Sequence, residues 1–291
     1  MKHIVRIAPS PTGQLHIGTL RTAYFNWLIA NQNDDSQLIV RIDDTDLSRS
    51  QDDLIQPIFD TLTDYGMNWD VVFRQSSRFS RYQDIAQKLV SRNLAIRRDG
   101  AVMLNNVHAY TLDADNVDLI WNDTITGPKV KISPQLDLLI RNQVIIKSDG
   151  SPTYNFASAV DDIDFGVTWV VRGTDHIVNT HKQALIYALL DNDLPLYTHV
   201  GLVCHSSGRK ISKRDSDALD LSQYDKDAVL NYILRLGWSP RQDDKSNNII
   251  PVDKAIQLFL DGGKMRASNC KFDLKKLQWY NKKYSHGHKR N

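Results

Sequence analysis

Cysteine is scarce in this chain of 291 residues, which contains only Cys204 and Cys270. Two cysteines cannot form a four-cysteine zinc site, and we expect no disulfide in a sequence that shows no secretory signal at its start. Long hydrophobic runs are missing too, which argues against a membrane-spanning helix. We therefore expect a cytoplasmic protein with no zinc and no membrane partner.

An excess of charge of one sign is also missing. The 36 Lys and Arg residues and the 34 Asp and Glu residues leave a formal net charge of +2. This balance permits RNA binding without arguing for it, because a binding groove depends on local rather than net charge. A hydrophobic content of 41% and a charged content of 24% are ordinary for a globular protein of one large or two modest domains.

Alternating strand and helix patterns dominate the chain. The N-terminal part predicts a strand over 3–7, a helix over 16–30 and a strand over 37–42, the order found in a parallel α/β sheet that binds ligands at its C-terminal strand ends. Residues 99–134 break this pattern and predict short β elements. The other predicted elements are helices at 51–66, 80–95, 181–190, 228–236 and 252–259, and strands at 167–172 and 196–204.

Two short segments suit a triphosphate. Residues 9–18 form a Pro- and Gly-containing turn with His16 and Gly18 at the start of a predicted helix, and residues 210–214 place two lysines three apart beside a hydroxyl. Helix N-termini attract phosphate oxygens, and lysine supplies a point charge to them. Either segment alone is weak, since such turns are common and a basic run is usually a solvated face. Their order and separation favour a nucleotide site.

The two segments resemble the HIGH and KMSKS motifs of class I aminoacyl-tRNA synthetases, specifically glutamyl-tRNA synthetases. The resemblance implies an α/β fold: a Rossmann-like parallel-sheet nucleotide-binding catalytic domain, a short inserted β-rich segment and a C-terminal helical stem-contact domain. Thr19 departs from the family by replacing the last His of the first motif. Further matches follow in the family's order at 5–8, 21–28, 41–46, 74–76, 147–154, 160–162, 171–176, 231–238 and 272–279.

This resemblance also implies a division of the chain. The expected parts are the first half of the catalytic domain at 1–98, an abbreviated acceptor-end-binding insertion at 99–137, the second catalytic half at 138–220, the stem-contact domain at 221–284 and a basic tail at 285–291. We expect the family's anticodon-binding domain to be absent. We also expect a monomer.

The resemblance implies that ATP, with Mg²⁺ held mainly by its phosphates and water, activates L-glutamate. The amino-acid carboxylate is already ionised, so the reaction needs positioning and charge stabilisation rather than a general base. The catalytic residues implied are His16, Gly18, Lys210, Ser212 and Lys213, and the ATP-binding residues are Pro9, His16, Gly18, Lys210 and Lys213.

The family pocket for glutamate maps onto residues of this sequence. The resemblance implies that Arg6 and Arg172 bind the carboxylates and that Asp43 binds the ammonium, although the family usually has Glu there and Asp is typical of glutaminyl enzymes. We favour glutamate, because a buried Arg172 facing a neutral amide would lack its partner. A structural salt bridge from Arg172 to a nearby Asp is the alternative. The glutamate-binding residues implied are Arg6, Ser10, Asp43, Tyr154, Arg172 and His176.

Some residues carry two interpretations. Asp44 and Asp46 suit a metal pair, but a loop in which they accept backbone hydrogen bonds is favoured. The salt bridge that is the alternative for Arg172 would run to Asp161 or Asp162. Aromatic side chains near the C-terminus suit either RNA stacking or the core, namely Trp279, Tyr280 and Tyr284.

Three functions follow from these features. The first is an ATP-dependent ligase that joins glutamate to the 3′ end of a tRNA. The second is a glutamate-activating relative that loads a modified tRNA base, as glutamyl-queuosine enzymes do, or a non-tRNA acceptor. Those queuosine enzymes usually carry a cysteine-bound zinc in the insertion, whereas this chain has no cysteine before Cys204. The third is a binding protein that has lost catalysis, against which the intact motifs argue.

Overall fold

The structure is a computed structural model that describes residues 2–105, 121–129, 143–211, 220–241 and 249–287. Its centre is a parallel sheet in two adjoining parts. In the first part β2 (Gln37–Ile42) lies between β1 (Ile4–Ile7) and β3 (Val71–Arg74). In the second, β10 (Leu196–Val200) runs parallel to β9 (Trp169–Gly173).

The two parts of the sheet meet where β1 lies beside β9. The backbone N–H of Thr168 donates to the carbonyl of Ile4 at 2.9 Å, just before β9 begins. On the far side of β10, the short strand β6 (Trp121–Asp123) pairs in parallel with it and turns back into β7 (Gly127–Lys129). Residues 121–129 thus extend the central sheet.

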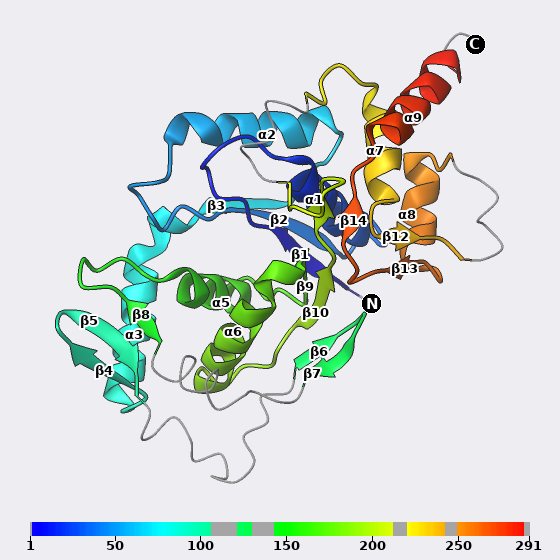
Figure 1. The fold of residues 1–291 in the computed structure, drawn as a ribbon. Helices are drawn as coiled ribbons and strands as arrows, with labels where there is room; N and C mark the ends of the chain where they lie inside the picture. The colour runs from blue at the N-terminus through cyan, green and yellow to red at the C-terminus, as the bar shows by residue number, and fades with distance from the viewer. Residues whose placement is uncertain (1, 106–120, 130–142, 212–219, 242–248, 288–291) are drawn as a thin grey trace.

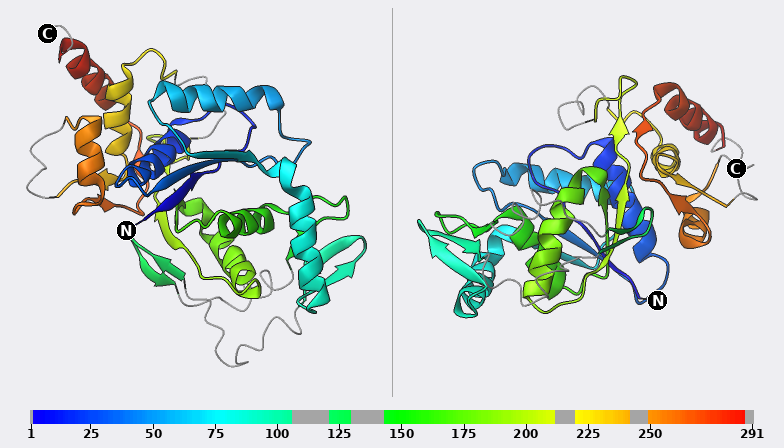
Figure 2. Two further views of the ribbon diagram at one scale, coloured as in Figure 1. Left: turned by 180° about the vertical axis from the view of Figure 1, so that it is seen from behind. Right: turned by 60° about the horizontal axis from the view of Figure 1, so that its bottom comes forward.

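Helices cover both faces of the sheet (Figures 1 and 2). The connections α1 (Ile17–Ala30) and α2 (Ile55–Asp64) lie on one face, and α5 (Tyr154–Asp164) and α6 (Ile177–Leu189) lie on the other. This arrangement agrees with the predicted parallel α/β fold, because both faces of such a sheet are apolar and must be covered. Short 3₁₀ turns occupy Asp52–Leu54, Gln75–Arg78 and Thr174–His176.

A small antiparallel sheet lies beside α3 (Phe79–Ser91), away from the nucleotide motifs. It consists of β4 (Ala95–Arg98), β5 (Ala101–Leu104) and β8 (Val144–Ile146). The sequence predicts a helix as far as residue 95, but α3 ends at Ser91. Asn93 has a φ of 58°, a left-handed conformation that Asn tolerates and that terminates a helix.

The C-terminal part is helical, as predicted, and gathers at one end of the molecule (Figure 1). The predicted strand over 196–204 is interrupted at Gly201. An added Cβ there would lie 2.0 Å from the Ser268 carbonyl oxygen, so the backbone at Gly201 packs directly against the backbone at Ser268. The elements are α7 (Lys226–Leu234), α8 (Val252–Leu260), α9 (Leu274–Gly287), the strand pair β11 (Val203–Cys204) and β14 (Cys270–Lys271), and the pair β12 (Trp238–Ser239) and β13 (Lys264–Met265).

One hydrophobic core joins α1 to the C-terminal helices. Phe25 on α1 packs against Phe259 on α8, with ring centroids 5.2 Å apart, and Tyr280 on α9 belongs to the same buried cluster. Arg21, also on α1 and fully buried, donates to the carbonyl oxygens of Gly201 at 2.7 Å and Leu236 at 3.0 Å. The helix that carries His16 at its start is therefore fixed against both the sheet and the helical part.

Candidate functional site

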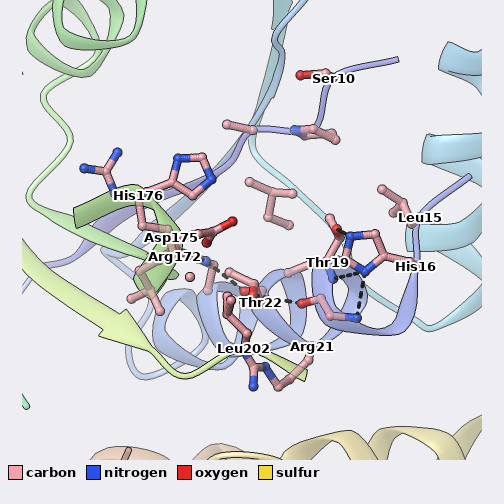
Figure 3. Close-up of a pocket in the computed structure, with 18 of the residues that line it drawn as sticks. Ser10, Leu15, His16, Thr19, Arg21, Thr22, Arg172, Asp175, His176 and Leu202 are labelled. Atoms are coloured by element: carbon pink, nitrogen blue, oxygen red, sulfur yellow. Dashed lines mark hydrogen bonds between the residues drawn. The ribbon is translucent and has the colours of Figure 1, made fainter. Parts of the chain in front are cut away.

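A cavity of about 310 Å³ opens at the C-terminal ends of β1 and β9, beside the start of α1 (Figure 3). This is the edge at which a parallel sheet binds its ligands. Ser212 and Lys213 lie outside the described residues. The cavity brings together ten of the residues predicted from the sequence: Arg6, Pro9, Ser10, His16, Gly18, Asp43, Tyr154, Arg172, His176 and Lys210.

His16 caps the N-terminus of α1 with its own ring. Its Nδ1 accepts from the backbone N–H groups of Gly18 at 3.1 Å and Thr19 at 3.4 Å (Figure 3). A neutral ring in this position carries its proton on Nε2, which lies 3.1 Å from the Thr19 hydroxyl. A Cβ at position 18 would lie 3.0 Å from the His16 ring, so glycine at this position avoids a close contact with the ring. The first N–H groups of α1 are thus taken up by His16, and what the helix start presents to an anion is the positive end of the helix dipole.

Lys210 spans the mouth of the cavity to Asp175. Its Nζ lies 2.5 Å from an Asp175 carboxylate oxygen, although the lysine side chain stays 46% exposed. Burial alone would raise the pKa of Asp175, but the hydrogen bond from Lys210 lowers it below its usual value. The segment that leads into the lysine motif is therefore held beside the end of β9.

The β2 side of the cavity is a buried network of paired charges. Arg41 donates to Asp43 at 2.6 Å and to Asp162 at 2.7 Å, and Arg6 donates to the same Asp162 at 3.3 Å. Burial raises the pKa of Asp43 to about 6, against the opposing effect of Arg41. Asp43 nevertheless reaches the cavity wall, so an incoming cation would meet a carboxylate already held in place.

Arg172, on the β9 side, is also buried but has no acidic partner in the part of the chain that the structure describes. Within the described residues it forms no ion pair, and its guanidinium donates to His199, Gln183 and Thr180 at 3.2, 2.9 and 2.5 Å. The alternative of a structural salt bridge to Asp161 or Asp162 is wrong. Those carboxylates accept instead from Arg41, Arg6 and Arg78. Burial accordingly lowers the pKa of Arg172. An arginine guanidinium nevertheless keeps its charge in proteins.

His176 and Tyr154 form the wall next to Arg172. The Tyr154 hydroxyl lies 3.4 Å from His176 Nδ1, and the Asn179 amide lies 3.2 Å from the same nitrogen. Burial, with Arg172 close by, lowers the pKa of His176 to about 4. At neutral pH the ring is therefore uncharged, and Arg172 is the cation on this wall.

The residues around the cavity favour an anion over a bare metal ion. The two carboxylates that line it, Asp43 and Asp175, are engaged by Arg41 and Lys210. Across the described ranges, no three His, Cys or acidic side chains gather as metal ligands would. The positive end of α1 suits phosphate, and a divalent cation would enter with phosphate oxygens and water as its ligands.

Two further predictions concern residues outside the cavity. Asp44 accepts from the backbone N–H and the hydroxyl of Ser76, both at 2.7 Å, and Asp46 accepts from Ser48. Asp44 thus ties the end of β2 to the turn after β3. Of the C-terminal aromatic residues, Tyr280 is buried at 1% exposure, whereas Trp279 is 40% exposed with Lys283 over its ring.

The sequence did not reveal every residue of this site. His199, Thr180 and Gln183 hold Arg172, yet none belongs to a recognisable motif. His199 in turn donates to Asp123 at 2.8 Å, a residue from the part of the chain predicted to be an insertion. Alternation along the strand at 196–200 could have indicated that Tyr197 and His199 share one face, but not which neighbour they meet.

A parallel sheet with helices on both faces, and a cavity between a His-capped helix start and a buried arginine, agree with the fold and site that the resemblance to class I tRNA synthetases implies. A sequence model described as "tRNA synthetases class I (E and Q), catalytic domain" matches residues 2–101 and 111–279, so the chain belongs to this family.

Relatives within the family carry more specific names. The chain is 40% identical over 292 residues to "Glutamate--tRNA ligase 2" of Neorickettsia sennetsu, covering 99% of this chain and 67% of that protein. It is 36% identical to "Glutamate--tRNA ligase" of Nostoc punctiforme, covering 97% of this chain and 66% of that protein. The chain thus spans about two thirds of the length of these curated relatives.

The fold has a close counterpart among solved structures. The glutamate tRNA ligase of Elizabethkingia meningosepticum, solved in complex with its amino acid, superposes with a TM-score of 0.83 at 24% identity, over 98% of this chain and 70% of that one. This likeness confirms the predicted Rossmann-like fold class. Within the described residues of our structure, no helix has the length and hydrophobicity that crossing a membrane requires.

Proposed function

We propose that this chain is a glutamate–tRNA ligase-like enzyme, which activates L-glutamate with ATP and transfers it to the 3′ end of a tRNA. The observation that carries the proposal is Arg172, a buried cation at the cavity wall whose described partners are all neutral. A buried guanidinium without a counter-ion is costly, and a substrate carboxylate would remove that cost.

The cavity offers complementary charges for the rest of glutamate. Arg6, which donates to Asp162 through Nε, would hold a second carboxylate with its remaining N–H groups. Asp43 would bind the ammonium, with Ser10, Tyr154 and His176 completing the wall. A neutral side-chain amide would leave the charge of Arg172 unmatched, which favours glutamate over glutamine.

ATP would lie between the start of α1 and the lysine motif. In the reaction, an oxygen of the glutamate α-carboxylate attacks the α-phosphorus, and the bond from that phosphorus to the oxygen bridging to the β-phosphate breaks, releasing pyrophosphate. His16 would donate from Nε2 to phosphate oxygens, Pro9 and Gly18 would border the nucleotide, and Lys210, Ser212 and Lys213 would stabilise the leaving charge. Mg²⁺ on the phosphates would neutralise further charge.

Transfer to tRNA completes the proposed function. A hydroxyl at the tRNA 3′ end attacks the activated carbonyl carbon, and the bond to AMP breaks. The names of the relatives support this acceptor over a modified base. We further propose that the enzyme acts as a monomer in the cytoplasm, where tRNA is charged.

Pyrophosphate exchange tests the proposal most directly. We expect exchange with glutamate but not with glutamine or aspartate when total tRNA is present, and labelled glutamate on an in vitro transcript of a glutamate tRNA, which contains no modified bases. Exchange without labelling of the transcript would favour the modified-base or non-tRNA acceptor. No exchange under any condition would refute the activity.

Lys213→Ala tests the role of the nucleotide motif. The charge of Lys213 is proposed to act mostly in the transition state, so the variant should lose most of the activation rate while keeping its glutamate affinity. An equal loss of glutamate binding would contradict that role.

A further inference from the structure

A row of three polar side chains crosses the sheet behind the cavity. His199 on β10 is the register partner of Arg172 on β9, so both side chains lie on the same face. On the other side of β10, the Asp123 carboxylate from β6 accepts from His199 Nδ1 at 2.8 Å and from the His199 backbone N–H at 2.9 Å. Asp123 thus contacts His199, and His199 contacts Arg172.

The direction of these hydrogen bonds fixes the proton on His199. Burial alone would raise the pKa of Asp123, but the hydrogen bonds from His199 and from the backbone of Thr126 and Ile125 lower it to about 2. An ionised carboxylate only accepts, so Nδ1 of His199 carries the proton. Nε2 is then an acceptor: the Nε–H of Arg172 donates to it at 3.2 Å, and the Thr180 hydroxyl, which itself accepts from Arg172, lies 2.9 Å from the same nitrogen.

This set of acceptors leaves a defined part of Arg172 for a ligand. A guanidinium has five N–H groups. His199 accepts from Nε, Gln183 from Nη1 and Thr180 from Nη2. One N–H on Nη1 and one on Nη2 therefore have no acceptor in the described part of the chain. Such a pair can bind a carboxylate through two parallel hydrogen bonds.

Packing prevents His199 from turning away. Its side chain is 1% exposed, stacked on the Tyr197 ring at 5.9 Å and met edge-on by Trp121 at 5.2 Å. The Tyr197 ring also lies under the guanidinium of Arg172, at 5.6 Å. The ring cannot exchange its nitrogens without breaking the bond to Asp123.

We propose that Asp123 and His199 are positioning residues that set the amino-acid specificity of the site: Asp123 holds His199 as the Nδ1–H tautomer, and His199 then orients Arg172 toward a side-chain carboxylate. The inference rests on the proposed use of glutamate. It assigns a specificity role to β6, which lies within the segment 99–137 predicted to bind an acceptor end.

Two substitutions of His199 separate its two hydrogen bonds. In His199→Gln, the amide oxygen falls near the place of Nε2 and can still accept from Arg172. In His199→Asn, the amide falls near the place of Nδ1 and can still donate to Asp123, but Arg172 loses its acceptor. Both variants are neutral and lose the ring, so similar melting temperatures are expected and packing loss is matched between them.

We expect His199→Asn to raise the KM for glutamate about 10-fold or more, as loss of a hydrogen bond to a charged group does. The KM for ATP should stay near that of the wild type, and the preference for glutamate over glutamine should fall. His199→Gln should stay within about threefold of the wild type in all three values. Asp123→Asn should resemble His199→Asn, since its amide would favour the other tautomer of His199.

A second measurement does not depend on activity. Nitrogen-15 NMR of labelled histidine should show His199 protonated on Nδ1 in the wild type and on Nε2 in Asp123→Asn. Equal rises in the KM for glutamate in both His199 variants, or a wild-type His199 protonated on Nε2, would overturn the inference while leaving the proposed function intact. Absence of any exchange by the wild type would instead overturn the proposed function, and this inference with it.

Discussion

Arg41 and Arg172 are two buried arginines on neighbouring parts of one sheet, and their surroundings are opposite. Arg41 is 1% exposed and Arg172 is 6% exposed. Arg41 pairs with Asp43 and Asp162, whose charges raise its pKa well above the usual value despite burial. Arg172 meets a histidine, an amide and a hydroxyl, and burial lowers its pKa.

The difference distinguishes an arginine that stabilises the fold from an arginine that is available to bind an anionic ligand. A buried cation that has its counter-ions stabilises the fold around it, and removing it leaves buried carboxylates without a partner. A buried cation that has only neutral acceptors is held in position but not neutralised. Burial alone would not distinguish these two arginines, whereas the charge of their partners does.

The largest effect should come from removing the arginine that has its counter-ions. Arg41→Leu leaves Asp43 and Asp162 without their strongest partner, and we expect a loss of about 3–5 kcal/mol in the free energy of unfolding. Arg172→Leu, the matched substitution, removes an unpaired charge along with three hydrogen bonds and should cost about 1–2 kcal/mol. Urea denaturation measures both, and equal losses would erase the distinction between the two sites.

The next effect concerns substrate choice rather than stability. Arg172→Gln should raise the KM for glutamate by a factor that corresponds to about 2–4 kcal/mol, and should relax discrimination against glutamine, because the site loses its charge but keeps a polar side chain. Exchange kinetics with both amino acids measure this effect. A variant that folds less well yet keeps its preference for glutamate would show that Arg172 is structural.

The smallest effect is a pH dependence of activity. It should come from Asp43, the partner of Arg41, and not from the residues around Arg172. Asp43 must be ionised to bind an ammonium, and burial raises its pKa to about 6. The value of kcat/KM for glutamate should therefore fall about tenfold for each pH unit below 6. His176, with a pKa of about 4, does not titrate in that range. A profile that is flat from pH 7 to pH 5 would exclude Asp43 as the group that binds the ammonium.

The features that could be predicted from the sequence are those that depend on residues close together in the chain. The turn and helix start around His16 lie within one stretch of ten residues, and periodicity predicted most helices to within a few residues. Arg6, Asp43 and Arg172 were found because they lie in short segments that resemble segments of the family. Their places on adjacent strand ends then follow from the parallel sheet.

What escaped prediction depends on contacts between distant segments. Asp123 stands on a strand of three residues, too short for a periodic signal, and its role appears only when β6 pairs with β10. Which arginine pairs with Asp161 and Asp162 is likewise decided by geometry. Arg41 and Arg172 carry the same charge, and the sequence gives no distances to choose between them. Such contacts carry no local signature.

Arg21 has a consequence for how the molecule comes apart. Its two bonds, to the Gly201 carbonyl at the end of β10 and to the Leu236 carbonyl after α7, tie three segments to one buried charge. Burial lowers its pKa to about 10. Water that entered at any of these segments would replace the carbonyl oxygens as the acceptors of its N–H groups. The helical end and the nucleotide end should consequently melt in a single cooperative transition, and a cut between residues 220 and 226 should yield two pieces that fold only in each other's presence.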